Sequence, residues 1–139
     1  MPSGAQGLDR KKLGSLVFKD EKRRKQLEDL IHPYVRRRME EEIAEAEEQV
    51  VILDIPLLFE ADFGWLCDKV LVVSTPQDVI EKRLQEKGFE AQEIRARLAA
   101  QMPLKEKEKR AHYVVDNSKT LKELKQQVEK LWREFRVKI

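Results

Sequence analysis

Three short apolar runs, at residues 50–53, 70–73 and 113–115, constrain the fold of this chain most strongly. They read Val-Val-Ile-Leu, Val-Leu-Val-Val and Tyr-Val-Val. Short, continuous runs rich in β-branched residues are typical of strands buried on both faces of a parallel sheet. Because helical patterns separate the runs, the sequence predicts a helix-rich α/β fold with a parallel sheet.

Helix signals precede the first run. Asp9 is placed to cap a short helix through Val17, and a second helix is expected over about residues 20–31. Pro33 is expected to end that helix and to open a long, charged one that continues to about residue 48. The sequence therefore predicts a helical and highly charged front part.

Further helix signals follow the second run. Thr75 is expected to cap a helix that has Pro76 in its first position and ends near Gly88. A helical pattern returns at residues 90–102, and Pro103 interrupts it.

The closing helix is predicted from its start and from its apolar face. Thr120 and Glu123 match a capping box. The apolar residues after them recur at helical spacing, as in an amphipathic helix. They are Leu121, Leu124, Val128, Leu131, Trp132 and Phe135.

Composition limits the class of protein. A length of 139 residues fits a single domain, and 28 Lys and Arg against 26 Asp and Glu leave a net charge of +2. The basic runs 22–25 and 36–38 have acidic neighbours, so they are interpreted as solvated helix faces rather than a nucleic-acid patch.

The lone cysteine, Cys67, favours a reducing compartment. No apolar run approaches the ~20 residues of a membrane helix, so a cytoplasmic protein without membrane or nucleic-acid partners is expected.

The candidate functional residues follow the predicted strands, because ligands of open parallel sheets bind outside the carboxyl ends of the strands. Each residue there also has a purely structural interpretation as a turn, a helix cap or an exposed side chain. The loop at 54–60 is unusual, since four of its seven residues are apolar, and such a loop closes a core or lines a pocket. The candidates are Asp54, Pro56, Glu60, Ser74, Thr75, Asp116 and Asn117.

Other catalytic patterns are weak or missing. His32 is either a general base or ligand, or part of a structural turn before Pro33; the turn is favoured because no second His or Cys lies nearby in the sequence. His112 is interpreted as a surface or boundary residue. No nucleophile elbow accompanies a Ser-His-Asp set. The five glycines nowhere show the spacing of a phosphate-binding loop.

Several motifs, taken in order, resemble bacterial dephospho-coenzyme A kinases. The most distinctive is Ile55-Pro56-Leu57-Leu58-Phe59-Glu60. Leu27-Glu28 with Ile31-His32-Pro33 precedes it, and Arg97-Leu98 with Gln101-Met102 and then Tyr113-Val114-Val115-Asp116-Asn117 follow. The resemblance extends from Gly7 to the last helix.

The resemblance implies a P-loop nucleoside monophosphate kinase-like fold, a three-layer parallel sheet. It implies transfer of the ATP γ-phosphate to the ribose 3′-hydroxyl of dephospho-coenzyme A, the last step of coenzyme A synthesis. About residues 9–49 would form the substrate-side helical region, and about residues 83–103 the lid over the nucleotide.

The resemblance also implies roles for individual residues. Arg97 would bind the nucleotide and neutralise phosphate charge during transfer. Lys87 stands where the family has a second lid arginine, and a lysine keeps the charge but loses the bidentate fork. Asn117 would lie in the turn near the adenine. The residues implied for dephospho-coenzyme A are Arg10, His32, Pro56, Leu57, Phe59 and Glu60.

These 139 residues lack the family's opening strand, phosphate-binding loop and helix, and the strand that carries the expected base. The chain is therefore expected to be a truncated domain, residues 1–139, that is inactive alone. ATP and Mg²⁺ are implied by the family, yet no motif here binds them. No metal-binding residues are expected. The alternative is a non-catalytic binding or assembly protein derived from the same fold.

The absent strand also affects how copies of the chain are expected to assemble. In the family the strand before the phosphate-binding loop lies between those matching residues 50–53 and 70–73. Without it two strand edges are exposed, and each unpaired buried backbone group costs roughly 1–3 kcal/mol. Either the two runs pair directly or a second copy covers the edges; a two-fold homodimer is favoured.

Overall fold

The computed structural model describes residues 7–17 and 20–136, and the chain divides into two compact units between Leu53 and Asp54. Each unit is described by itself. The predicted helical region of residues 9–49 falls in the first unit and the predicted lid, residues 83–103, in the second. The elements are α1 (Arg10–Val17), α2 (Glu21–Glu45), the 3-10 helix η1 (Gly64–Leu66), β1 (Leu71–Ser74), α3 (Gln77–Glu86), α4 (Ala91–Ala99), α5 (Leu104–Arg110), β2 (Tyr113–Asp116) and α6 (Leu121–Arg136).

The helices of the first unit begin at carboxylate caps. Asp9 Oδ1 accepts a hydrogen bond from the Lys12 amide at 2.9 Å, and Asp20 Oδ1 accepts one from the Arg23 amide at 3.1 Å. Each carboxylate satisfies an amide that the first turn of a helix leaves without a partner. The predicted start of α1 is confirmed.

Helix α2 continues through Pro33, so the predicted interruption there is wrong. Proline has no N–H and cannot donate to the carbonyl of Asp29, which costs one helical hydrogen bond. Good helix formers and ion pairs across successive turns oppose this loss. His32 therefore lies inside a helix and not in the predicted turn. The ion pairs are Arg36–Glu40, Arg37–Glu41 and Arg38–Glu42.

The run at residues 50–53 is not a strand, which corrects the sequence prediction. Within the described residues the only sheet pairs β1 with β2. The side chains of Val51 and Ile52 are 43% and 84% exposed. β-branched residues favour extended backbone, but a strand also needs a neighbour for its N–H and C=O groups. Within residues 7–17 and 20–136 the run forms no ladder with residues 70–73, so the predicted alternative of direct pairing is not found there.

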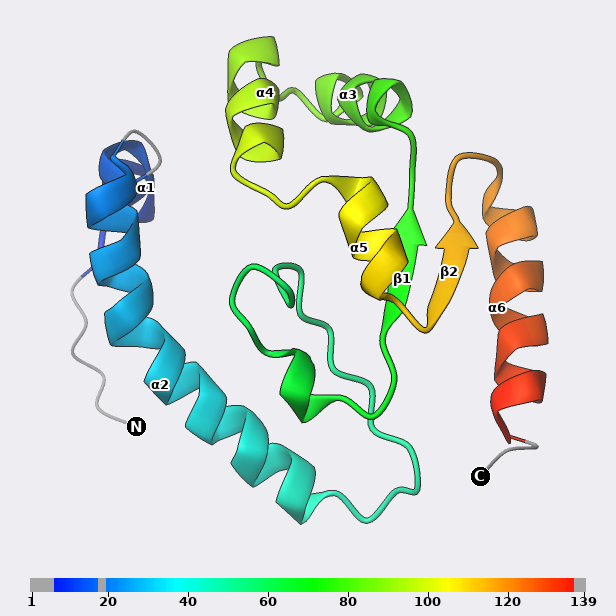
Figure 1. The fold of residues 1–139 in the computed structure, drawn as a ribbon. Helices are drawn as coiled ribbons and strands as arrows, with labels where there is room; N and C mark the ends of the chain where they lie inside the picture. The colour runs from blue at the N-terminus through cyan, green and yellow to red at the C-terminus, as the bar shows by residue number, and fades with distance from the viewer. Residues whose placement is uncertain (1–6, 18–19, 137–139) are drawn as a thin grey trace. The chain divides into compact units, whose positions relative to one another are not determined.

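The second unit confirms the predicted α/β fold with a parallel sheet. Leu71 lies opposite Tyr113, and Ser74 lies opposite Asp116. Figure 1 shows the two strands between α5 and α6, with α3 and α4 beyond the carboxyl end of β1. The run of charges at residues 105–110, where no apolar periodicity predicts a helix, lies within α5.

Thr75 belongs to the core of the second unit. It is 8% exposed, and the residue that precedes α3 is Pro76, which makes no side-chain cap bond. The predicted cap at Thr75 is therefore wrong by one position, because the threonine side chain is buried instead of reaching over the helix start. The buried apolar side chains are Phe63, Val70, Val72, Ile94 and Val115.

Two helix boundaries match their sequence signals. After α3, Gly88 has a φ of +88°, and the Phe89 amide donates to the Leu84 carbonyl at 3.1 Å, as in a Schellman motif. Before α6, Glu123 Oε2 accepts from the Thr120 amide at 3.0 Å, and Thr120 Oγ1 accepts from the Glu123 amide at 3.3 Å. The predicted helix end and capping box are both confirmed.

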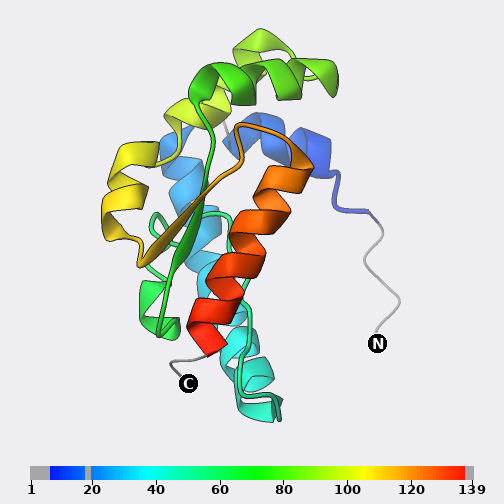
Figure 2. The ribbon, with the colours of Figure 1, turned by 90° about the vertical axis from the view of Figure 1, so that its right-hand side faces the viewer.

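Helix α6 packs on the sheet through part of its apolar stripe. The ring of Phe135 meets that of Tyr113 edge to face at 6.5 Å and stacks on Trp132 at 6.1 Å. Figure 2 shows the helix alongside the strands. Leu121 and Val128, on the same stripe, are 66% and 44% exposed. The stripe is therefore only partly covered within the described residues.

Candidate functional site

The carboxyl ends of β1 and β2 are joined by polar contacts. The Asn117 amide donates to the Ser74 carbonyl at 2.8 Å, which extends the strand pairing by one residue. Ser74 Oγ donates to Glu108 Oε1 at 2.5 Å and so ties β1 to α5. The structure thus brings two predicted candidates, Ser74 and Asn117, together at the sheet edge where ligands of this fold class bind.

Arg83, in the last turn of α3, holds the turn that follows β2. Its Nη1 donates to the Asn117 carbonyl at 2.6 Å, and its Nη2 donates to the Lys119 carbonyl at 3.3 Å. A planar guanidinium suits two acceptors at once. Arg83 is not among the predicted site residues, because nothing in the spacing shows which backbone carbonyls a helix-terminal arginine reaches.

The two predicted lid cations are accessible. Lys87 is the exposed residue that ends α3. Arg97, on α4, is 44% exposed; its Nη2 lies 2.7 Å from Glu93 Oε1, and its guanidinium lies 5.2 Å from the centre of the Phe89 ring. Local contacts therefore hold the Arg97 side chain along its own helix while its charge still faces solvent.

Glu60 is turned inward and joins three segments. Its Oε1 lies 2.7 Å from Lys107 Nζ on α5 and accepts a hydrogen bond from the Met102 amide at 2.9 Å. The side chains of Glu60 and Lys107 are only 18% and 13% exposed. Glu60 Oε2 is buried and has no hydrogen-bond partner among the described residues. Burial raises the pKa of Glu60, but the bonds from Lys107 and Met102 outweigh it, so the net shift is downward.

The rest of the predicted substrate loop is less enclosed. Pro56 and Leu57 are exposed, Leu57 to 42%. The ring of Phe59 is half-buried, with the Arg110 guanidinium 6.0 Å from its centre. The loop therefore both packs on α5 and presents apolar side chains to solvent.

Two predicted substrate residues belong to the first unit. Arg10 begins α1, and its side chain lies outside the described part of the chain. His32 is half-buried on α2. Their proposed association with the loop at residues 54–60 remains a prediction.

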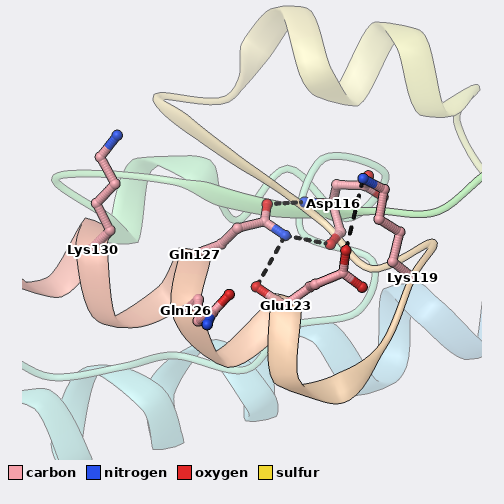
Figure 3. A pocket seen from close by; sticks show the side chains of 6 residues that line it. All are labelled: Asp116, Lys119, Glu123, Gln126, Gln127 and Lys130. Atoms are coloured by element: carbon pink, nitrogen blue, oxygen red, sulfur yellow. Dashed lines mark hydrogen bonds and ion pairs between the residues drawn. The ribbon is translucent and has the colours of Figure 1, made fainter.

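An open hollow in the surface lies between the end of β2 and α6 (Figure 3). Gln127 occupies its middle: its Oε1 accepts from the Asp116 amide at 2.9 Å, and its Nε2 donates to the Asp116 carbonyl at 2.9 Å. Hydrogen bonds from Ser118 lower the pKa of the Asp116 carboxyl. Internal bonds thus use these polar groups to fasten β2 to α6. The lining residues are Asp116, Lys119, Glu123, Gln126, Gln127 and Lys130.

Two kinds of feature are absent from residues 7–17 and 20–136. No group of three or more His, Cys, Asp or Glu side chains there is arranged to hold a metal ion. None of the helices in that part has the length and apolar character needed to cross a membrane.

Two solved structures resemble this chain. The crystal structure of TT1252 from Thermus thermophilus has a TM-score of 0.78 and 38% identity, covering 94% of this chain and 69% of that one. The dephospho-CoA kinase from Campylobacter jejuni has a TM-score of 0.62 and 32% identity, covering 91% and 65%. The fold is that of the P-loop NTPase class.

Sequence relatives narrow this class. The family model for dephospho-CoA kinase matches residues 3–123. The dephospho-CoA kinase of Lactobacillus johnsonii is 41% identical over 134 residues, which cover 94% of this chain and 68% of that protein. The one from Geobacillus kaustophilus is 45% identical over 125 residues, covering 87% and 62%. The chain belongs to the dephospho-CoA kinase family, which confirms the resemblance found in its motifs.

Proposed function

We propose that this chain acts in the ATP-dependent phosphorylation of the 3′-hydroxyl of dephospho-coenzyme A, the last step of coenzyme A biosynthesis. Its relatives bear the name of this kinase. One observation carries the proposal: the two ends of the lid bond to two predicted substrate segments, Arg83 to the Asn117 carbonyl and the Met102 amide to Glu60. A lid fastened to both segments is suited to closing over both substrates.

The lid supplies positive charge for the phosphates. Arg97 is accessible on α4, and its guanidinium can turn from Glu93 to a phosphate oxygen. Lys87 adds a second charge at the end of α3. Phosphoryl transfer depends on neutralising charge on the oxygens of the transferred group, which is the role proposed for both residues. Asn117 is proposed to lie beside the adenine, in the turn that Arg83 holds.

The other predicted substrate residues, apart from Glu60, are proposed to recognise dephospho-coenzyme A. The exposed Pro56 and Leu57 offer apolar contact, and Phe59 lies beside them. Arg10 and His32 would supply polar contacts from the helical region. A cytoplasmic location belongs to the same proposal, because a lone cysteine favours a reducing compartment.

A chain of these 139 residues alone is proposed to have no turnover. No stretch of it has the glycine spacing that cradles the β- and γ-phosphates. Positioning and electrostatic stabilisation of the phosphates supply most of the rate of this reaction. A coupled assay of the purified chain, free of host enzyme, should stay at background. Turnover within about tenfold of the ~10 s⁻¹ of an ordinary enzyme would contradict this proposal.

The role of the lid can be tested by ATP titration. Arg97→Ala should weaken ATP binding by about tenfold, the effect of losing one charge-assisted hydrogen bond. Arg95→Ala is the matched control, since Arg95 is also exposed on α4. Equal losses in both variants would show that Arg97 has no particular place in the nucleotide site.

A second candidate function, assembly without catalysis, is supported by exposed apolar side chains on both strands. Leu71, Val73 and Val114 are 43%, 54% and 47% exposed. A second copy that covered them would remove this surface from water, and two-fold symmetry would satisfy both copies at once. Light scattering over a dilution series should show a dimer. A stable monomer of about 16 kDa would contradict this candidate.

A further inference from the structure

The C-terminal end of the lid depends on one carboxylate. The amides of Ala100 and Gln101 still donate to helical carbonyls of α4, at 3.2 Å each. The next amide, that of Met102, lies beyond the helix and donates to Glu60 Oε1 at 2.9 Å. Pro103, which follows, has no amide hydrogen to donate. Glu60 therefore supplies the acceptor at the point where the chain leaves α4 and enters α5.

Lys107 holds this carboxylate in place from α5. The Lys107–Glu60 pair spans 2.7 Å with both side chains less than a fifth exposed, whereas the Arg97–Glu93 pair on α4 has side chains 44% and 46% exposed. An enclosed pair keeps its geometry because water competes less for either charge. The downward shift in the pKa of Glu60 agrees with a carboxylate that stays ionised in this position.

We propose that Glu60 is a positioning residue of the lid: fixed by Lys107, it anchors the Met102 amide and thereby sets the hinge from which α4 carries Arg97. The reading of α4 as a lid rests on the proposed function. Glu60 would act through the hinge and not by touching substrate, since its Oε1 already has two donors and its Oε2 is buried. With Arg83 fastening the other end, both ends of the lid are tied by contacts between residues distant in sequence.

Amide hydrogen exchange of the 139-residue chain, followed by NMR, tests this role without requiring activity. Glu60→Ala removes the acceptor, so exchange at Met102 and in α4 should rise by about tenfold or more, while exchange in β1 and β2 should change by less than about twofold. Glu60→Gln keeps a side-chain carbonyl that can accept from the same amide, so it should restore most of the protection at Met102. Glu106→Gln is the matched control, because Glu106 makes an exposed pair with Lys109 on α5.

If Glu60→Ala does not fold, Lys107→Met provides the same test by releasing the carboxylate from its partner, with an expected rise of about threefold at Met102. Unchanged exchange at Met102 and in α4 would overturn the proposal. A uniform rise that includes β1 and β2 would also overturn it, because that pattern indicates a general structural role. If amide exchange rises as expected but Arg97→Ala and Arg95→Ala weaken ATP binding equally, the result would instead count against the proposed function.

Discussion

Among the described residues, the ion pairs of the first unit join residues three or four apart, whereas the second unit also has one that joins distant segments. On α2 the Arg37–Glu41 pair joins residues four apart, with side chains 81% and 43% exposed. In the second unit the Lys107–Glu60 pair joins a helix to a distant loop, with side chains 13% and 18% exposed. The first pair stabilises one helix, whereas the second fixes the relative position of separate segments. A charge count alone therefore does not indicate which charges shape the fold.

The largest expected effect comes from breaking the enclosed pair. Glu60→Ala should lower the free energy of unfolding of the second unit by roughly 2–3 kcal/mol, because it leaves Lys107 without its partner and the Met102 amide without an acceptor. Urea unfolding followed by the fluorescence of Trp65 and Trp132 measures this unit, which holds both tryptophans. Glu106→Ala is the control, and a loss below about 0.5 kcal/mol for Glu60→Ala would remove the contrast between the two units.

The next effect concerns Arg83. Arg83→Met keeps most of the aliphatic stem but loses both bonds to the Asn117 and Lys119 carbonyls, so it should cost roughly 1–2 kcal/mol. Thermal unfolding monitored by the same tryptophans measures the loss. Lys82→Met, at the exposed neighbouring position, should change little. Equal changes in both variants would mean that the long-range bonds of Arg83 add nothing to stability.

A smaller effect on stability is expected when the pH is lowered. Because the pKa of Glu60 is lowered in the folded chain, its stabilising contribution is complete above the pKa of the unfolded chain, about 4.3, and is lost as pH falls through the folded value. The stability advantage of the wild type over Glu60→Gln should therefore shrink between about pH 5 and pH 3. A protonated carboxyl still accepts from Met102, so this change is smaller than that of Glu60→Ala. A constant difference over this range would contradict the assigned shift.

The smallest effect is expected on α2. Arg37→Ala should change stability by less than about 0.5 kcal/mol, because water screens an exposed pair between residues four apart. Circular dichroism at 222 nm during urea unfolding measures the loss of total helix, to which α2, with 25 residues, is the longest contributor among the described helices. A loss above about 1 kcal/mol would show that the charges of α2 take part in tertiary contacts.

The sequence predicted those features that neighbouring residues decide. The Asp9 cap, the stop at Gly88 and the Thr120 capping box each depend on groups within a few residues, and all three are confirmed. The predictions were wrong where the local structure depends on contacts between distant residues or on the stability of a whole helix. Thr75 is buried rather than capping, and α2 continues past Pro33.

The strand predictions show the same limit. Residues 50–53 and 70–73 have nearly the same composition, yet within the described part of the chain only the second run pairs with another strand. For the candidate site, motifs pointed to Glu60 and to the lid, but no spacing rule could show that Lys107 and Met102 are the partners of Glu60. Such partners emerge only when the fold brings distant segments together.

Titration of the purified 139-residue chain with dephospho-coenzyme A tests most directly whether it keeps substrate recognition without turnover. Saturable binding is expected, and Arg10→Ala should weaken it by about tenfold, whereas Lys12→Ala, on the same helix, should leave it within about twofold. Folded protein that shows no saturable binding would contradict the account. So would an unchanged affinity in Arg10→Ala, which would remove α1 from the substrate site.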